Sequence, residues 1–184
     1  MRALISSLAG ASALLLLTAC SGGGGGSSTP PPSYATSLSY TNPTSGQYQL
    51  VKDSASSGGT LVLDLVGPAG ASISGVSFSA SADTSKVTWT TPISTTGTAF
   101  NLGSAPQAVA TKLSGTELQG AVSQKGTSSP VTLTSTSVLA KVTLTLKANV
   151  TAGPVTLSDT SKGAYLDGTG VHNTAVAMGT LSAQ

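Results

Sequence analysis

Alternation of apolar and polar residues in short segments is the feature that most constrains the fold of this chain. In the segment 60–66 three leucines occupy every second position, and in the segment 141–147 a valine and two leucines alternate with threonine and lysine. A period of two places the apolar residues on one face of a β-strand. No long stretch combines apolar residues at helical spacing with a helix cap. The pattern therefore predicts an all-β protein.

Shorter alternating segments recur along the chain and are separated by turn residues such as Gly67-Pro68 and Asp167-Gly168. Strands at this spacing favour an antiparallel sandwich of two sheets with roughly nine to eleven strands. A parallel sheet would need helical crossovers, which the sequence does not offer. The other predicted strands are 48–51, 73–80, 87–90, 99–102, 108–113, 118–123, 131–134, 155–158 and 175–181.

Hydroxyl groups rather than charges dominate the polar side chains. The chain of 184 residues contains 30 Ser and 27 Thr, against eight basic and six acidic residues, and its formal net charge is +2. The basic residues are scattered singly, so no stripe could follow a phosphate backbone, and nucleic acid is excluded as a partner. The composition is typical of exported all-β proteins.

The first twenty residues have the pattern of a signal peptide. Met1-Arg2 gives a positive start, and the apolar stretch 3–17 is shorter than the roughly 20 residues that span a bilayer. The following Leu17-Thr18-Ala19-Cys20 resembles the lipobox of bacterial lipoproteins. This resemblance implies cleavage before Cys20, a diacylglycerol on its sulfur and a further acyl chain, such as palmitate, on its new amino group. The alternative is an ordinary secretory signal with an incidental cysteine.

Three parts are therefore expected: a lipoprotein signal peptide (1–19), a lipidated Cys20 with a Gly/Ser/Pro linker (20–33), and a β-sandwich domain (34–184). Two or three acyl chains would anchor the protein permanently to the cell envelope. By resemblance to lipoprotein sorting patterns, Ser21 favours the outer membrane if the host is Gram-negative. The linker would hold the domain roughly 25 Å from the lipid surface.

Three segments resemble cohesin-like domains. Segment 60–90 contains a strand, a Gly-Pro-Ala-Gly loop, the strand Ile73-Ser-Gly-Val-Ser-Phe-Ser-Ala and then Val87-Thr-Trp89. Segment 138–158 is similar to the family's late hairpin, and Val176-Ala-Met-Gly179-Thr-Leu181 is similar to its closing strand. The resemblance implies a cohesin-like jelly roll of about nine strands. It also implies a non-catalytic interaction or structural module whose partner is a dockerin-like or other secreted protein.

The sequence offers little for catalysis or for a cofactor. The single histidine, His172, has no acid immediately beside it, and the six acids form no recognisable catalytic pair. Zinc would need additional Cys or His ligands. The oxygen-rich stretch from Asp159 to Asp167 is a weak candidate calcium loop, but it lacks the spacing of a calcium-binding motif. We expect no enzyme activity and no cofactor.

Carbohydrate binding on the cell surface is the alternative function. Sugars stack on exposed aromatic rings, and the candidates are Trp89, Tyr40, Tyr48 and Tyr165. Trp89 shares one side of its predicted strand with Val87, which favours a core position over a sugar platform. The predicted partner is therefore a secreted protein or, in the alternative, a polysaccharide.

Overall fold

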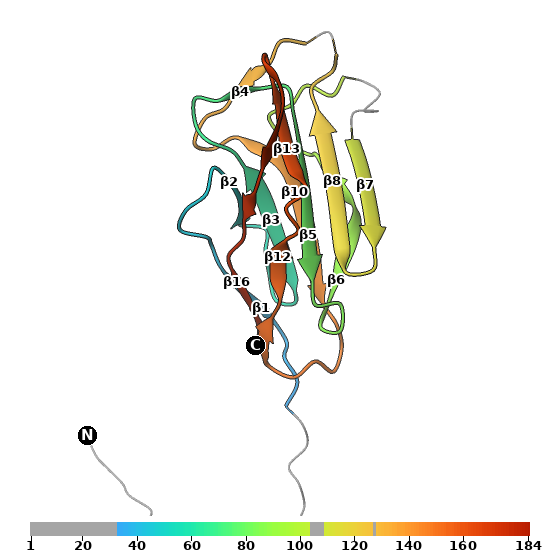
Figure 1. Cartoon of the computed structure of the whole chain (residues 1–184). Helices are drawn as coiled ribbons and strands as arrows, with labels where there is room; N and C mark the ends of the chain where they lie inside the picture. Colours follow the sequence, from blue (N-terminus) through green and yellow to red (C-terminus); the bar gives the residue numbers. More distant parts are fainter. Residues whose placement is uncertain (1–32, 104–108, 127) are drawn as a thin grey trace, which may run out of the picture. The chain divides into compact units, whose positions relative to one another are not determined.

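In the computed structural model, all regular structure among the described residues is β-strand (Figure 1). The structure describes residues 33–103, 109–126 and 128–184. Within these ranges no helix long and apolar enough to cross a membrane is present. The all-β prediction is therefore confirmed, whereas the signal peptide and Cys20 lie outside the described residues.

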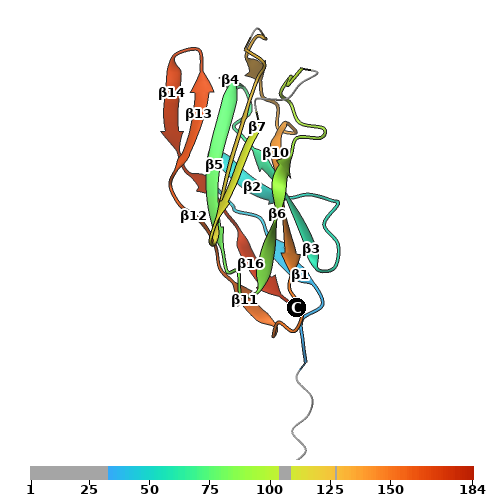
Figure 2. The same cartoon turned by 90° about the vertical axis from the view of Figure 1, so that its right-hand side faces the viewer.

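Two large sheets form the layers of a sandwich (Figure 2). All their strand pairs are antiparallel except the parallel pair β15–β2. The five-stranded sheet contains, in order, β15 (Val176–Ala177), β2 (Tyr48–Lys52), β3 (Thr60–Val66), β10 (Val138–Leu146) and β6 (Val87–Ser94). The six-stranded sheet contains β14 (Gly170–Thr174), β13 (Gly163–Asp167), β5 (Gly75–Ala82), β8 (Glu117–Ser123) and β7 (Val109–Ser114), with β12 (Leu157–Asp159) also paired to β5.

Two smaller sheets complete the fold. One has the order β1 (Leu38–Thr41), β16 (Thr180–Ala183) and β11 (Gly153–Val155), and the other pairs β4 (Ser72–Ile73) with β9 (Val131–Thr132). The first and last strands are thus direct neighbours. The backbone N–H groups of Thr36 and Ser37 also donate to the carbonyl of Gln184, at 2.6 and 2.8 Å. The start of the described chain and its end therefore lie side by side.

The core lies between the inner faces of the two large sheets. Leu61, Leu63 and Leu65 of β3 are fully buried, as the alternation predicts, and Phe78 of β5 and Leu118 of β8 belong to the same apolar cluster. Each such side chain contributes roughly 1.5–3 kcal/mol when removed from water. The period of two therefore assigns one face of each strand to the core and leaves the other for solvent or a partner.

The strands are more numerous than the sequence predicted because several predicted segments each contain two strands. Segment 73–80 contains the end of β4 and most of β5, and segment 155–158 spans β11 and β12. Segment 99–102 is not a strand, although Phe100 is buried there. Strand β1 and the hairpin β13–β14 were not predicted. In the hairpin, β13 has three consecutive apolar residues and β14 has only one large apolar residue, so neither strand shows a clear period of two.

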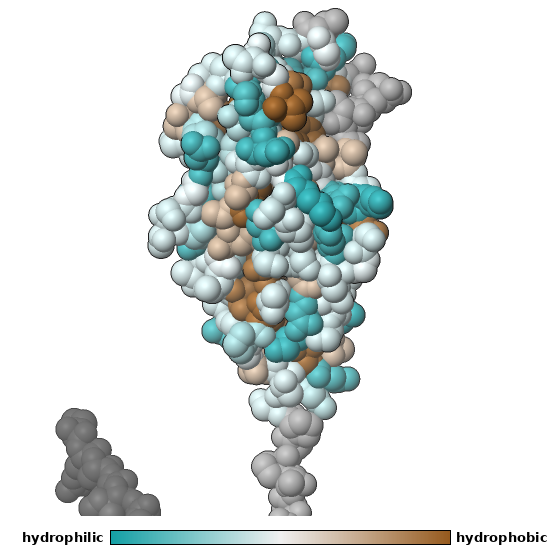
Figure 3. All heavy atoms as spheres, viewed as in Figure 1, coloured by the Kyte–Doolittle hydropathy of each residue, from teal (hydrophilic) through white to brown (hydrophobic). Residues whose placement is uncertain are grey.

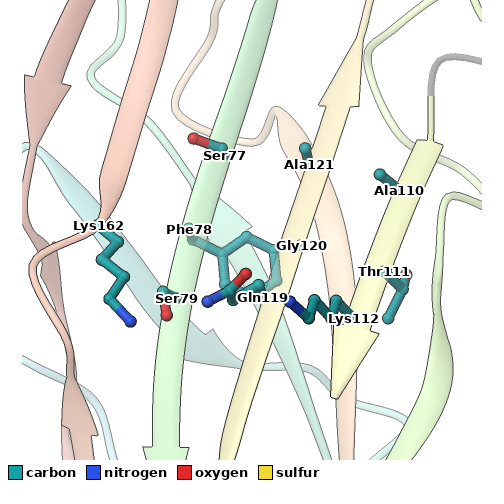
Figure 4. Close-up of a pocket in the computed structure, with 10 residues that line it drawn as sticks. All are labelled: Ser77, Phe78, Ser79, Ala110, Thr111, Lys112, Gln119, Gly120, Ala121 and Lys162. Carbon is teal, nitrogen blue, oxygen red and sulfur yellow. The ribbon is translucent and has the colours of Figure 1, made fainter. Parts of the chain in front are cut away.

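Gly120 in β8 is needed for the packing of Phe78. A Cβ atom at position 120 would lie 2.5 Å from Cζ of Phe78 and 3.1 Å from Cδ1 of Ile93. Figure 4 shows the Phe78 ring between β5 and β8, next to Gly120. Close packing in this layer therefore depends on the absence of a side chain at position 120.

Substitution Gly120→Ala should lower the free energy of unfolding by about 1–3 kcal/mol, because the methyl group forces the Phe78 ring to move in a packed core. Chemical denaturation of the full chain measures this change. Gly126→Ala is the matched control, since a Cβ atom at position 126 meets no atom within 4 Å. Equal effects of the two substitutions would contradict the packing role of Gly120.

Candidate functional site

The outer face of the six-stranded sheet carries a continuous row of small side chains. Ala164 of β13 pairs with Ser77 of β5, Ser77 pairs with Ala121 of β8, and Ala121 pairs with Ala110 of β7. All four point outward, because their neighbours Val76, Phe78, Leu118 and Val122 belong to the core. Neighbouring strands are about 4.8 Å apart, so this small-residue row runs for roughly 14 Å across the sheet.

Longer side chains on both sides turn the small-residue row into the floor of a trough. On one side lies a hollow of about 280 Å³ that is bordered by Lys112, Gln119 and Lys162. On the other side lies a hollow of about 200 Å³ that is bordered by Leu166 and Val171. Both hollows are lined by Ser77 and Ala121, so they adjoin along the row. Figure 4 shows the small side chains on one side of Phe78 and the polar ones on the other.

A network around Glu117 fixes the polar side of the trough. Glu117 Oε1 accepts hydrogen bonds from Ser79 Oγ at 2.6 Å and from Gln119 Nε2 at 2.7 Å. Lys162 Nζ lies 2.8 and 3.0 Å from the two carboxylate oxygens. Hydrogen bonds from Lys162, Ser79 and Gln119 lower the pKa of Glu117 from 4.5 to about 2. The network ties β5 and β8 to the segment that precedes β13 and keeps Lys162 beside the trough.

The opposite side of the trough is aliphatic. Leu166 pairs with Val171 across the β13–β14 hairpin, and their side chains are 37% and 72% exposed. Most of this face has neutral hydropathy, and a hydrophobic spot lies near the hairpin (Figure 3). The trough therefore offers a partner two kinds of contact, one cationic and polar and the other apolar.

Three of the four predicted ligand-binding rings belong to the core. Tyr40, Tyr48 and Trp89 are 7%, 1% and 4% exposed. Trp89 Nε1 donates to the carbonyl of Thr116, and Tyr40 Oη donates to that of Leu50. Burial raises the pKa of Tyr40, and burial together with nearby Tyr165 and Asp167 raises that of Tyr48 to about 12. These three rings present no face on which a sugar could stack.

Tyr165 is half-buried and lies in a stack of rings. Its centroid lies 5.5 Å from that of Tyr48 and 5.0 Å from that of His172. His172 Nε2 lies 2.9 Å from Thr169 Oγ1 and 3.1 Å from Asp167 Oδ1. Both contacts use the same ring nitrogen, whereas a catalytic histidine uses one nitrogen for the nucleophile and the other for the acid. The geometry therefore differs from that of a hydrolytic triad.

The two acids of the predicted calcium loop cap backbone groups. Asp167 Oδ1 accepts hydrogen bonds from the N–H groups of Thr169 and Gly170 in the β13–β14 turn, and Asp159 Oδ2 accepts one from the N–H of Val176. The pKa of Asp167 is lowered to about 2, mainly by the hydrogen bonds from Thr169. In the part of the chain that the structure describes, no three His, Cys, Asp or Glu residues cluster as metal ligands would.

Comparison with known proteins gives no family match. No family model and no curated protein matches the chain. One similar solved structure is the sixth cohesin of scaffoldin B from Acetivibrio cellulolyticus, which was solved in complex with a mutant Cel5 dockerin. Its sequence is 16% identical to this chain, and the TM-score is 0.49. The alignment covers 79% of this chain and 98% of that chain. The seventh ScaB type I cohesin from Pseudobacteroides cellulosolvens is 14% identical, with 71% and 83% covered and a TM-score of 0.47. The structural neighbours are cohesins, but at these scores the likeness has no functional weight.

The small-residue row was not predicted from the sequence as a site. Alanine and serine carry little chemistry, so no motif marks them. The available signal was the alternation in Val76-Ser77-Phe78-Ser79-Ala80, which assigns the two serines to the outer face. Only the strand order shows that Ser77 lies beside Ala121 and Ala164.

Substitution Glu117→Gln should make the protein less stable near neutral pH, with a thermal midpoint lower by a few degrees. The carboxylate stabilises the fold above its unfolded-state pKa of 4.5, and this contribution is lost as the pH falls through the folded-state pKa of about 2. The variant and the original chain should therefore converge in strong acid. Thermal melts followed by circular dichroism across this pH range measure the two midpoints. A difference between the midpoints that does not change with pH would contradict the stabilising role of the Glu117 carboxylate.

Proposed function

We propose that this chain is a lipid-anchored, non-catalytic interaction module whose trough on the six-stranded sheet binds a secreted protein. The observation that carries the proposal is the small-residue row. Because its four side chains are short, the backbone of a partner can approach the sheet closely along roughly 14 Å. The resemblance of the sequence to cohesins sets the expected class of partner, a dockerin-like or other secreted protein.

The two sides of the trough give the contact its orientation. Lys112 and Lys162 favour acidic or carbonyl groups of the partner at one side, and Leu166 and Val171 favour apolar side chains at the other. Lys162 already neutralises Glu117 at 2.8 Å, so the net attraction on the polar side is modest. Specificity would come mainly from the shape of the trough.

The outer face of the five-stranded sheet is less suited to binding. Its central charge, Lys141, is paired with Asp53 and also lies 3.3 Å from Asp64. Around it the outward side chains of β10 include the branched Thr143 and Thr145, so no comparable row of small residues exists there among the described residues. This face supplies the matched control for a binding experiment.

Substitution Ala121→Arg should weaken partner binding, because a long cation in the middle of the small-residue row fills the trough. The full chain, tagged and isolated from its host, would be used to capture secreted proteins, and the affinity of the recovered protein would then be measured. We expect a loss of at least tenfold, about 1.4 kcal/mol. Thr143→Arg should leave the affinity unchanged, because Thr143 is a half-buried outward residue of the other sheet.

Equal binding by the Ala121→Arg and Thr143→Arg variants would contradict the assigned face. Retention of polysaccharide instead of protein would support the carbohydrate alternative. Tyr34, which is 45% exposed, is then the first ring to substitute, because the rings of Tyr40, Tyr48 and Trp89 are buried.

The proposed anchor rests on the sequence Leu17-Thr18-Ala19-Cys20, in which Cys20 is the single cysteine of the chain. Substitution Cys20→Ala should remove all incorporation of labelled palmitate and shift the protein from the membrane fraction to the soluble fraction, because no other thiol can carry the lipid. Metabolic labelling and cell fractionation measure both effects. If mass spectrometry found Met1 at the amino terminus of the mature protein, this result would contradict the proposed anchor.

A further inference from the structure

The strand orders of the two large sheets end in four edge strands, and three of these are protected. A further strand, β12, lies outside these orders, pairs only with β5 and has just three residues. β6 contains Pro92, which cannot donate a hydrogen bond to an added strand. β7 lies beside β6, where the N–H of Ile93 donates to Thr111 Oγ1 at 3.1 Å, so the sandwich is closed on that side. β15 has only two residues. Short strands, prolines and covered edges are the usual ways in which proteins prevent strand addition.

The fourth edge strand, β14, lacks these protections. It has five residues, Gly-Val-His-Asn-Thr, with no lysine and no proline, and it pairs with β13 in an uninterrupted register from Gly170 to Thr174. It is the last strand on its side of the six-stranded sheet, and Figure 2 shows it as the outermost strand there. Val171, the second residue of β14, is the most exposed large hydrophobic residue among the described residues, at 72%.

The edge of β14 is complementary to itself. If a second copy pairs antiparallel about Val171, each Val171 lies opposite the same residue of the other copy. Leu166 already lies beside Val171 in the hairpin, so the pairing joins two short apolar rows into one of four aliphatic side chains. β14 contains no lysine, arginine or acidic residue, so no like charges oppose each other. Such cross-strand apolar pairs stabilise antiparallel sheets.

We propose that two copies of this chain associate through antiparallel pairing of their β14 strands about Val171, which merges their six-stranded sheets into one. The interface is isologous, with the same residues contributed by both copies. The strand direction is reversed in the second copy, so the two chains enter the joined sheet from opposite ends. Because the described chain starts at the end of the sandwich opposite the β13–β14 turn (Figure 1), the pairing suits copies on two facing surfaces.

The arrangement on facing surfaces rests on the proposed lipid anchor. The experiment therefore measures membrane attachment and strand pairing by separate readouts. The full acylated chain, isolated in detergent, would be reconstituted into two populations of phosphatidylcholine vesicles with different fluorescent labels. Flotation of the protein with the vesicles tests the anchor. Clustering of the two colours, measured by light scattering and energy transfer, tests the pairing.

A charge exchange at position 171 tests the register. Vesicles with the unsubstituted chain should cluster, and vesicles with only Val171→Lys or only Val171→Glu should not, because like charges then face each other. A mixture of the two variants should cluster again. The matched control is Leu113→Lys, which alters an exposed aliphatic residue on the opposite edge strand and should cluster like the original chain.

Three results would overturn the proposal while the protein still floats with the vesicles. These are absence of clustering by the original chain, clustering by Val171→Lys alone, and loss of clustering by Leu113→Lys. Disulfide formation by a Val171→Cys variant provides an independent measurement. It should give a covalent dimer, whereas the original chain, which has only Cys20, and a Leu113→Cys variant should not. Circular dichroism of each variant checks that the strands are retained.

Discussion

The packing of large side chains between the two sheets is the interaction on which the rest of the structure depends. Phe78 and the leucines of β3 fill the interior, and Gly120 gives the Phe78 ring room against β8. Since the inner face of the six-stranded sheet supplies the apolar bulk, its outer face can consist of alanine and serine without loss of the core. The small-residue row on the outer face is therefore a consequence of placing the large apolar side chains on the inner face.

Most of the few acidic residues are used within the molecule. Glu117 is paired with Lys162, and Lys141 bridges Asp53 and Asp64. The Ala55 N–H and Lys141 lower the pKa of Asp53 to about 2, whereas burial raises the pKa of Asp64. The exposed lysines outside these pairs, among them Lys52, Lys125 and Lys147, are scattered singly, so long-range attraction contributes little to the choice of the proposed partner. Recognition has to come from shape and from the polarity of short side chains, which agrees with the large number of hydroxyl groups.

The sequence was sufficient for the layers of the fold but not for the site. Regular alternation predicted β3 and β10, because a period of two is a local property of the chain. The hairpin β13–β14 was missed, since β13 has three consecutive apolar residues and β14 only one large apolar residue, so neither shows the alternation. The aromatic residues were ambiguous for a similar reason: a ring in a strand suits the core or a ligand equally well until the partner sheet is known. Ala164, Ser77 and Ala121 are separated by up to 87 positions, so their alignment exists only after the strands have paired.

The pairing of the first strand with the last also affects how the chain reaches its folded state. β1 has its strand partner in β16, some 140 residues later in the sequence, and closure over such a separation is slow. During synthesis, the amino-terminal strand has no strand partner until the carboxyl-terminal strand has emerged. This delay suits the export proposed above, because closure before passage through a translocation channel would block the polypeptide.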